Sequence, residues 1–362
     1  MPYWIPPTAT SDCRHRRWCR VASALAFAAL VASAPTATAK ALKIATTAPD
    51  GSSWMKVLRQ AGADVAAATE GRVEIKYYPG GVRGDDQQVL RRIRVRQLDG
   101  GIVQTGVFSR LFTDVQIYNL PMVFENLDEV DAVREVVDPL LVAGLAEAGF
   151  VALGIAEIGM AYAMSTKEVR SLADARRLKV WSPQGDRPAE RALSAFRIKP
   201  IPLGLAEVLS GLQTDLIDTV AAPPVAVLPL SWHTKLRYVL DLPFMYIYSL
   251  VVVSDRSLRD IAEADVVALK RIMGAGIAEV DRLNRADHSA AWQALEKQGL
   301  EFLSPTENEV AEWRSNARLA TRLWIDEGIV SKGMHATLTS VLDQARSKQA
   351  VRTVLEPGFA GR

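Results

Sequence analysis

One strand–helix alternation occurs twice along the chain, and this repetition is the feature that most limits its fold. In the first copy, short apolar segments alternate with amphipathic helices, and glycine or proline turns separate them. The expected elements are a strand at 42–47, a helix at 54–68, a strand at 73–77, a helix from about Asp85 and a strand at 102–105. This order is typical of a parallel α/β sheet.

The second copy repeats the plan with similar residues. Segment 178–183 (LKVWSP) matches the pattern of 42–46 (LKIAT), and segment 211–220 matches the helix-to-strand passage at 96–103. We therefore predict two α/β lobes of similar build. A chance resemblance between two βα units is the alternative.

Two long apolar segments are predicted to connect these lobes. Residues 150–164 and 244–253 are rich in β-forming residues and are too long for one strand inside one lobe, so we expect hinge strands that cross between the lobes. A helix at 265–298 would be about 50 Å long, enough to lie across both lobes. A capping box at 304–307, with Pro305 at the first helical position, is expected to begin the next helix. The expected boundaries are 40–160 plus 252–290 for lobe one, 161–251 plus 291–350 for lobe two, and a tail at 351–362.

The N-terminal segment has the pattern of a secretory signal peptide. Four arginines precede an uncharged run at 21–34, which is shorter than the roughly 20 residues of a membrane-spanning helix, and Ala37-Thr38-Ala39 follows it. We predict a signal peptide at 1–39, cleavage after Ala39 and a periplasmic mature protein. An amphipathic anchor helix is the alternative, and the choice between general and twin-arginine export stays open.

The composition excludes several classes of protein. A net charge of +2 gives no reason to expect nucleic acid as a partner. Both cysteines, Cys13 and Cys19, would leave with the leader, so the mature chain would have no thiol nucleophile. The nucleophile-elbow, phosphate-loop and H-E-x-x-H motifs do not occur, and the histidines are scattered. We therefore expect no cofactor, no metal and no catalytic residue.

Three ordered segments resemble those of a known family. Segments 48–54 (APDGSSW), 78–85 (YPGGVRGD) and 206–214 (AEVLSGLQT), the last followed by Ile217-Asp218, resemble the dicarboxylate-type extracytoplasmic solute receptors of TRAP transporters. The resemblance implies an α/β two-lobe periplasmic binding protein fold with crossing hinge strands and a long lobe-spanning helix. It further implies a receptor, not an enzyme, that captures a small organic acid between its lobes and delivers it to a sodium-driven membrane permease.

The chain departs from the pattern of that family at three positions. The resemblance implies an arginine that clamps the ligand carboxylate, but Trp181 occupies its place, and Ala161 and Ala222 replace two further polar anchors. Trp181 offers a flat apolar face and one N–H donor, so we expect it to stack on the ligand. Ordinary packing between the lobes is the alternative. Arg110 and Arg187 are candidates for a relocated positive charge.

The expected ligand contacts lie where strands end and on the crossing strands, because ligands of open α/β sheets bind beyond the carboxyl ends of the strands. They are Trp54, Thr105, Phe108, Glu157, Trp181, Asp186 and Tyr246. Glu157 and Asp186 could alternatively receive a cation or a metal-bridged ligand. Two other functions stay open, namely a periplasmic hydrolase or lyase with one of these carboxylates as base, and a binding module coupled to a sensor. The sequence leaves the identity of the ligand and the oligomeric state open.

Overall fold

A single mixed sheet runs through the whole fold of residues 40–355. The computed structural model describes residues 1, 3–4 and 39–355, so the predicted signal peptide lies almost entirely outside the described residues, as does the end of the tail. The strands lie in the order β2-β1-β3-β8-β4-β7-β5-β6, with β9 beside β8. Within the described residues, none of the helices is both long and apolar enough to cross a bilayer.

The two ends of the sheet are built alike. At one end, β1 (Lys40–Thr46) pairs in parallel with β2 (Val73–Tyr78) and β3 (Gly100–Gln104). At the other end, β5 (Val180–Pro183) pairs in parallel with β6 (Pro200–Leu203) and β7 (Thr219–Ala222). The predicted repetition is therefore confirmed, since both matching segments form the central strand of a three-stranded parallel group. We call the first group with its helices lobe one and the second group lobe two.

Two long antiparallel strands join the lobes, as the sequence predicts. β4 (Phe150–Ser165) and β8 (Tyr238–Ser254) pair along their whole length, β8 pairs also with β3 and β9 (Glu301–Leu303), and β4 pairs also with β7. Their pairing is interrupted by four register shifts between Ala152 and Met164. The sheet is continuous from lobe to lobe, so the boundaries proposed above stay a prediction.

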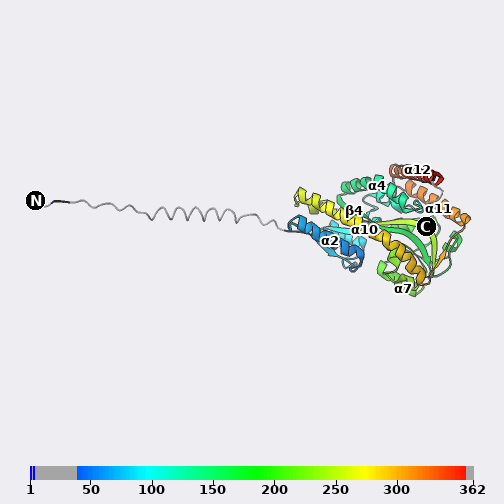
Figure 1. Cartoon of the computed structure of the whole chain (residues 1–362). Coiled ribbons are helices and arrows are strands. Elements are labelled where there is room, and N and C mark those ends of the chain that lie inside the picture. The colour runs from blue at the N-terminus through cyan, green and yellow to red at the C-terminus, as the bar shows by residue number, and fades with distance from the viewer. Residues whose placement is uncertain (2, 5–38, 356–362) are drawn as a thin grey trace. The chain divides into compact units, whose positions relative to one another are not determined.

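Helices cover both faces of the sheet, as Figure 1 shows. The longer ones are α2 (Ser53–Ala68), α3 (Asp86–Arg94), α4 (Leu127–Glu147), α6 (Arg187–Ala195), α7 (Val208–Gln213), α10 (Glu263–Lys297), α11 (Glu307–Asp326) and α12 (Lys332–Leu355). The shorter ones are α5 (Leu172–Ala175), α8 (Pro224–Val227) and α9 (Asp255–Leu258). α10 packs on α2 in lobe one, on β4 and on α8 in lobe two, which confirms the predicted lobe-spanning helix.

The buried side chains form one core on each face of each lobe. In lobe one, α4 and α12 cover one core, whereas α2 and α10 cover the other. In lobe two, α7 lies over one core together with the end of α10, and α6 and α11 enclose the other. Both faces of the sheet are thus covered, as a largely parallel sheet requires.

One predicted helix start was wrong. The N-cap of α11 is Thr306 instead of Ser304, because the Thr306 side chain accepts a hydrogen bond from the Glu309 amide while the Glu309 carboxylate accepts one from the Thr306 amide (2.7 Å). The same Ser/Thr-x-x-Glu spacing therefore occurs with better partners two residues later. Pro305 stays outside the helix.

Candidate ligand-binding site

Lobe one and lobe two touch each other where β3 and β5 end. The Gln87 side-chain amide at the start of α3 donates a hydrogen bond to the Gly185 carbonyl after β5 (2.8 Å). Gly106, just beyond β3, lies so close to Asp186 that a Cβ at this glycine would stand 2.7 Å from its carboxylate. The carboxyl ends of strands from both lobes therefore meet at one place, which is where a ligand of this kind of sheet is expected.

Two half-buried carboxylates lie at this contact. Asp86 accepts a hydrogen bond from the Gln104 amide through Oδ2 (2.9 Å), whereas its buried Oδ1 has no partner among the described residues. Asp186 caps α6 by accepting from the Ala189 amide (3.1 Å). Burial raises the pKa of both carboxyls to about 6, and the charge of Asp186 adds to the shift at Asp86. Each carboxylate is thus costly to keep charged while the lobes touch.

Neutral polar side chains extend the same region into lobe one. Asn119 donates through Nδ2 to Thr105 Oγ1 (2.8 Å) and to Gln116 Oε1 (3.0 Å). Gln116 Nε2 and Asn119 Oδ1 are buried, and neither has a partner among residues 39–355. Ser182 Oγ at the end of β5 is likewise buried without a described partner. Buried polar atoms are nearly always hydrogen-bonded, so these atoms mark places where a ligand or water can bind.

One cation with an unpartnered nitrogen lies in the loop that follows β2. The guanidinium of Arg83 lies 4.2 Å from the centre of the Tyr78 ring, and its buried Nε has no partner among the described residues. Its loop is held to the end of β1 by hydrogen bonds from Gly80 to Ala48 (2.8 Å) and from Gly81 to Thr46 (3.0 Å). Sequence reasoning missed Arg83 as a site residue, although a basic residue in a glycine-rich loop after a strand is a signal that could have found it. Of the two cations it named, Arg110 is exposed and the side chain of Arg187 lies outside the described residues.

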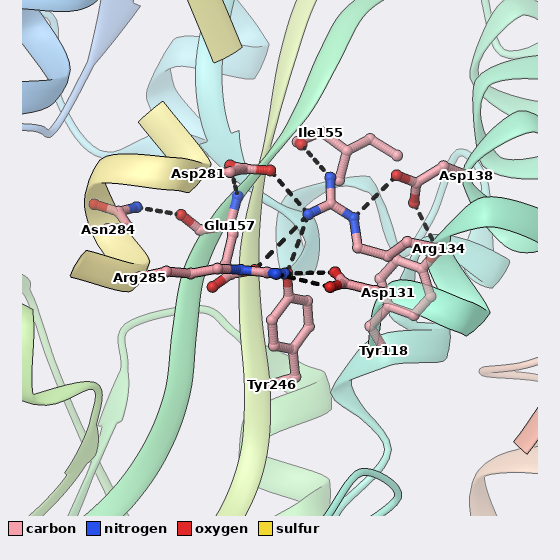
Figure 2. Close-up of polar contacts among 10 residues, drawn as sticks. All are labelled: Tyr118, Asp131, Arg134, Asp138, Ile155, Glu157, Tyr246, Asp281, Asn284 and Arg285. Carbon is pink, nitrogen blue, oxygen red and sulfur yellow. Dashed lines mark hydrogen bonds and ion pairs between the residues drawn. The ribbon is translucent and has the colours of Figure 1, made fainter. Parts of the chain in front are cut away.

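A second polar cluster occupies the middle of the crossing strands, as Figure 2 shows. Glu157 of β4 is only 2% exposed and accepts hydrogen bonds from Tyr246 Oη (3.1 Å) and from Arg285 Nε and Nη2 (3.0 and 2.7 Å). Arg285 of α10 also binds both oxygens of Asp131 in α4 (2.8 and 2.6 Å). We call this cluster, with the residues added below, the hinge network.

Arg134 of α4 holds the other half of the hinge network. Its guanidinium donates to Asp138 (3.0 Å), to Asp281 of α10 (2.9 Å) and to the Ile155 carbonyl of β4 (2.7 Å). Burial raises the pKa of Tyr246 well above its usual value, and the neighbouring Glu157 and Asp281 add to the shift. The network ties α4, α10, β4 and β8 together, so it fixes the geometry between the crossing strands and their covering helices.

The seven predicted site residues fall into four places. Thr105 and Asp186 lie together at the strand ends. Glu157 and Tyr246 lie in the hinge network, where Trp54 joins them because its N–H donates to Asn284 Oδ1 (2.7 Å) and Asn284 binds the Glu157 carbonyl. Phe108 is buried against the Phe150 ring, with centroids 4.9 Å apart.

Trp181 lies inside lobe two. It is 8% exposed, its ring meets Trp232 edge-on at 5.3 Å, and its N–H donates to the Leu203 carbonyl (3.0 Å). The free donor expected from the sequence is therefore already bonded within the lobe. Ligand contact by any of the seven residues stays a prediction. Among the described residues, no group of three or more His, Cys, Asp or Glu is arranged to hold a metal.

Comparison with known proteins identifies what the chain is similar to. The family described as "Bacterial extracellular solute-binding protein, family 7" (DctP) matches residues 44–325. An uncharacterized Haemophilus influenzae protein is 24% identical over 67% of this chain and 74% of its own length. The uncharacterized protein YiiZ of Salmonella typhimurium is 25% identical over 43% of this chain, and that match spans about half of YiiZ (49%).

Solved structures with low sequence identity share the fold. DctP7 of Bordetella pertussis, described as a receptor binding pyroglutamic acid, has a TM-score of 0.77 at 17% identity, over 84% of this chain and 100% of that protein. A TRAP periplasmic solute-binding protein of Xanthobacter autotrophicus, solved with bound β-D-galacturonate, has a TM-score of 0.76 at 16% identity. One of Chromohalobacter salexigens, solved with bound D-glucuronate, has a TM-score of 0.76 at 19% identity. Each of these two matches covers 83% of this chain and 99% of the other protein. The predicted two-lobe binding-protein fold is thus confirmed.

Proposed function

Because this chain belongs to the DctP family of bacterial extracellular solute-binding proteins, we propose that it captures a small organic acid in the periplasm and delivers it to a sodium-driven TRAP permease. The observation that carries the proposal is the meeting of two similar α/β lobes at their strand ends, joined by β4 and β8. A ligand that contacts both lobes binds the closed state more tightly than the open one, and so favours closure by that difference in affinity. The proposal includes export by the N-terminal leader, with cleavage after Ala39.

The proposed site is the region around Thr105, Asp86 and Asp186. The ligands bound to the related receptors, galacturonate and glucuronate, each combine one carboxylate with several hydroxyl groups. Arg83 would meet the carboxylate, and the unpartnered oxygens of Asp86 and Asn119 would accept hydrogen bonds from hydroxyl groups. This assignment replaces the family arginine that the chain lacks at Trp181.

The other predicted residues have a supporting role in this proposal. Trp54, Glu157 and Tyr246 hold the hinge network, and Phe108 and Trp181 pack the lobes. Glu157 already accepts hydrogen bonds from Tyr246 and Arg285, which is a reason against its acting as a catalytic base. We therefore propose a receptor without catalytic activity instead of a hydrolase or lyase.

A thermal-shift screen of small organic acids tests this function. A ligand at 100 times its dissociation constant stabilises the folded protein by about 2.7 kcal/mol, which such a screen detects. We expect a hydroxylated monocarboxylate to stabilise the mature protein and to be recovered unchanged after long incubation. Conversion of the ligand to a product would contradict the receptor function and favour an enzyme.

A further inference from the structure

A groove outside the strand-end site lies against the crossing strands. It has a volume of about 460 Å³ and is lined by Tyr162, Asp241, Trp292, Gln293, Glu296 and Phe302. These residues come from β4, β8, α10 and β9, and none of them belongs to the candidate site or to the hinge network. We call this feature the aromatic groove.

Three aromatic rings form its apolar wall. Trp292 meets Tyr162 edge-on, with ring centroids 4.6 Å apart, and packs against Phe302 at 4.8 Å. The Trp292 N–H donates to His288 Nε2 (2.7 Å), so this donor is not available to an occupant. Burial lowers the pKa of His288, which keeps that imidazole neutral near pH 7. The wall therefore offers π-electron density and no positive charge.

Two carboxylates border the same groove. Asp241 and Glu296 are exposed, and within residues 39–355 neither carboxylate forms an ion pair or hydrogen bond. Burial together with the charge of Asp241 raises the pKa of Tyr162 to about 12, so the phenol stays neutral. The groove thus combines aromatic rings with two uncompensated negative charges. It would repel the organic acid that the strand-end site is proposed to take.

The position of the groove connects it to the hinge. Tyr162 lies opposite Pro243 of β8, between two of the register shifts that interrupt the β4–β8 pairing. Asp241 comes from the other crossing strand, and Trp292 and Glu296 come from the lobe-spanning helix α10. Bending of the crossing strands at these irregularities would change the distances between the groove residues, so an occupant would respond to lobe closure.

We propose that the aromatic groove receives an arginine side chain of the membrane permease when the loaded receptor docks. The inference rests on the function proposed above. A guanidinium is flat, stacks on aromatic faces and binds carboxylates through paired hydrogen bonds, which matches the rings and carboxylates of the groove. Because Asp241, Gln293 and Glu296 are exposed, a side chain can enter from a partner's surface.

The first test uses a short peptide as a substitute for the permease. The probe is acetyl-Gly-Arg-Gly-amide, and the control is the same peptide with citrulline, which has the shape of arginine without its charge. The indole N–H signal of Trp292, assigned with Trp292→Phe, reports binding by NMR. We expect the arginine peptide to bind about tenfold more tightly than the citrulline peptide, and this preference to disappear in Asp241→Asn/Glu296→Gln. Equal binding of both peptides, or no shift of the Trp292 signal, would overturn the proposal.

The second test uses the permease reconstituted in vesicles. The double variant should lower ligand uptake about tenfold while its affinity for the organic acid stays the same, and Glu312→Gln, an exposed carboxylate on α11, should change neither. Unchanged uptake by the double variant would overturn docking through this groove. If the unmodified protein binds no organic acid at all, that result would instead contradict the proposed function.

Discussion

The carboxylate of Asp186 in lobe two packs directly against Gly106 in lobe one, with no room between them for a side chain at position 106. A Cβ at Gly106 would lie within 2.9 Å of three atoms of that carboxylate. This contact brings the two lobes together at their strand ends.

The Gly106–Asp186 contact predicts the effect of a single added methyl group. Gly106→Ala should hold the lobes apart and weaken ligand binding about tenfold, since added atoms in a tight contact cost about 1–3 kcal/mol. Titration calorimetry measures the affinity, and small-angle X-ray scattering measures the opening. The matched control is Gly51→Ala, because nothing lies within 4 Å of a Cβ there. Full affinity in Gly106→Ala would show that closure does not need this contact.

Lobe closure without ligand should depend on pH. Burial raises the pKa of Asp86 and Asp186 to about 6 where the lobes touch, and Asp85 and Glu190 add negative charge nearby. When the lobes open, water reaches both carboxyls and their pKa should fall toward about 4. The closed state therefore binds more protons between pH 4 and 6, so its stability is greatest below that range and is lost as pH rises through 6.

We accordingly expect the radius of gyration of the ligand-free protein to decrease between pH 7 and pH 5. Asp86→Asn/Asp186→Asn should remove this change, because neither amide titrates, and Asn at position 186 can still cap α6. A radius of gyration that does not change between pH 7 and pH 5, or that changes equally in the double variant, would contradict the role of Asp86 and Asp186 in pH-dependent closure.

Arg83 should carry the positive charge that the organic acid needs. Arg83→Gln should weaken binding about tenfold or more, since a hydrogen bond to a charged group contributes about 1.5–3 kcal/mol. Arg110→Gln is the control, because Arg110 is an exposed arginine in the segment after β3. Calorimetric titrations of both variants with the same organic acid compare their affinities with that of the unmodified protein. A larger loss in Arg110→Gln would place the carboxylate elsewhere.

The hinge network should contribute strongly to stability. Arg134→Met would remove the cation that pairs with Asp138 and Asp281 and would leave Glu157 paired with Arg285 alone, and breaking a buried ion pair costs about 3–5 kcal/mol. Arg282→Ala, which removes an exposed pair with Glu279, should cost less than about 1 kcal/mol. Chemical denaturation compares the two free energies of unfolding. Similar values would mean that the network is as weakly stabilising as a surface pair.

Trp181 should act in folding more than in binding. Trp181→Ala is expected to lower the free energy of unfolding by about 3–5 kcal/mol, because it leaves a cavity beside Trp232 and removes one of the two hydrogen bonds that the Leu203 carbonyl accepts. The affinity of the variant that remains folded should stay within about threefold of the unmodified protein. An affinity loss of about thirtyfold with little change in stability would restore the stacking role predicted from the sequence.

Local sequence patterns predicted the elements better than the contacts between them. The crossing strands and α10 could be predicted because apolar runs and helical periodicity are properties of neighbouring residues. The partners of Glu157 could not be predicted in this way, since Arg285 is 128 residues away and only packing brings the two side chains together. Arg83 was missed for a similar reason, because its buried, unpartnered Nε depends on how the loop folds back onto β1.

The most direct test of the central claim is a crystal structure of the mature protein with the tightest-binding organic acid from the screen. We expect the ligand between the two lobes, with its carboxylate at Arg83 and hydroxyl groups within hydrogen-bond distance of Asp86 and Asn119. Ligand bound outside the contact between the lobes, or touching only one of them, would contradict the account.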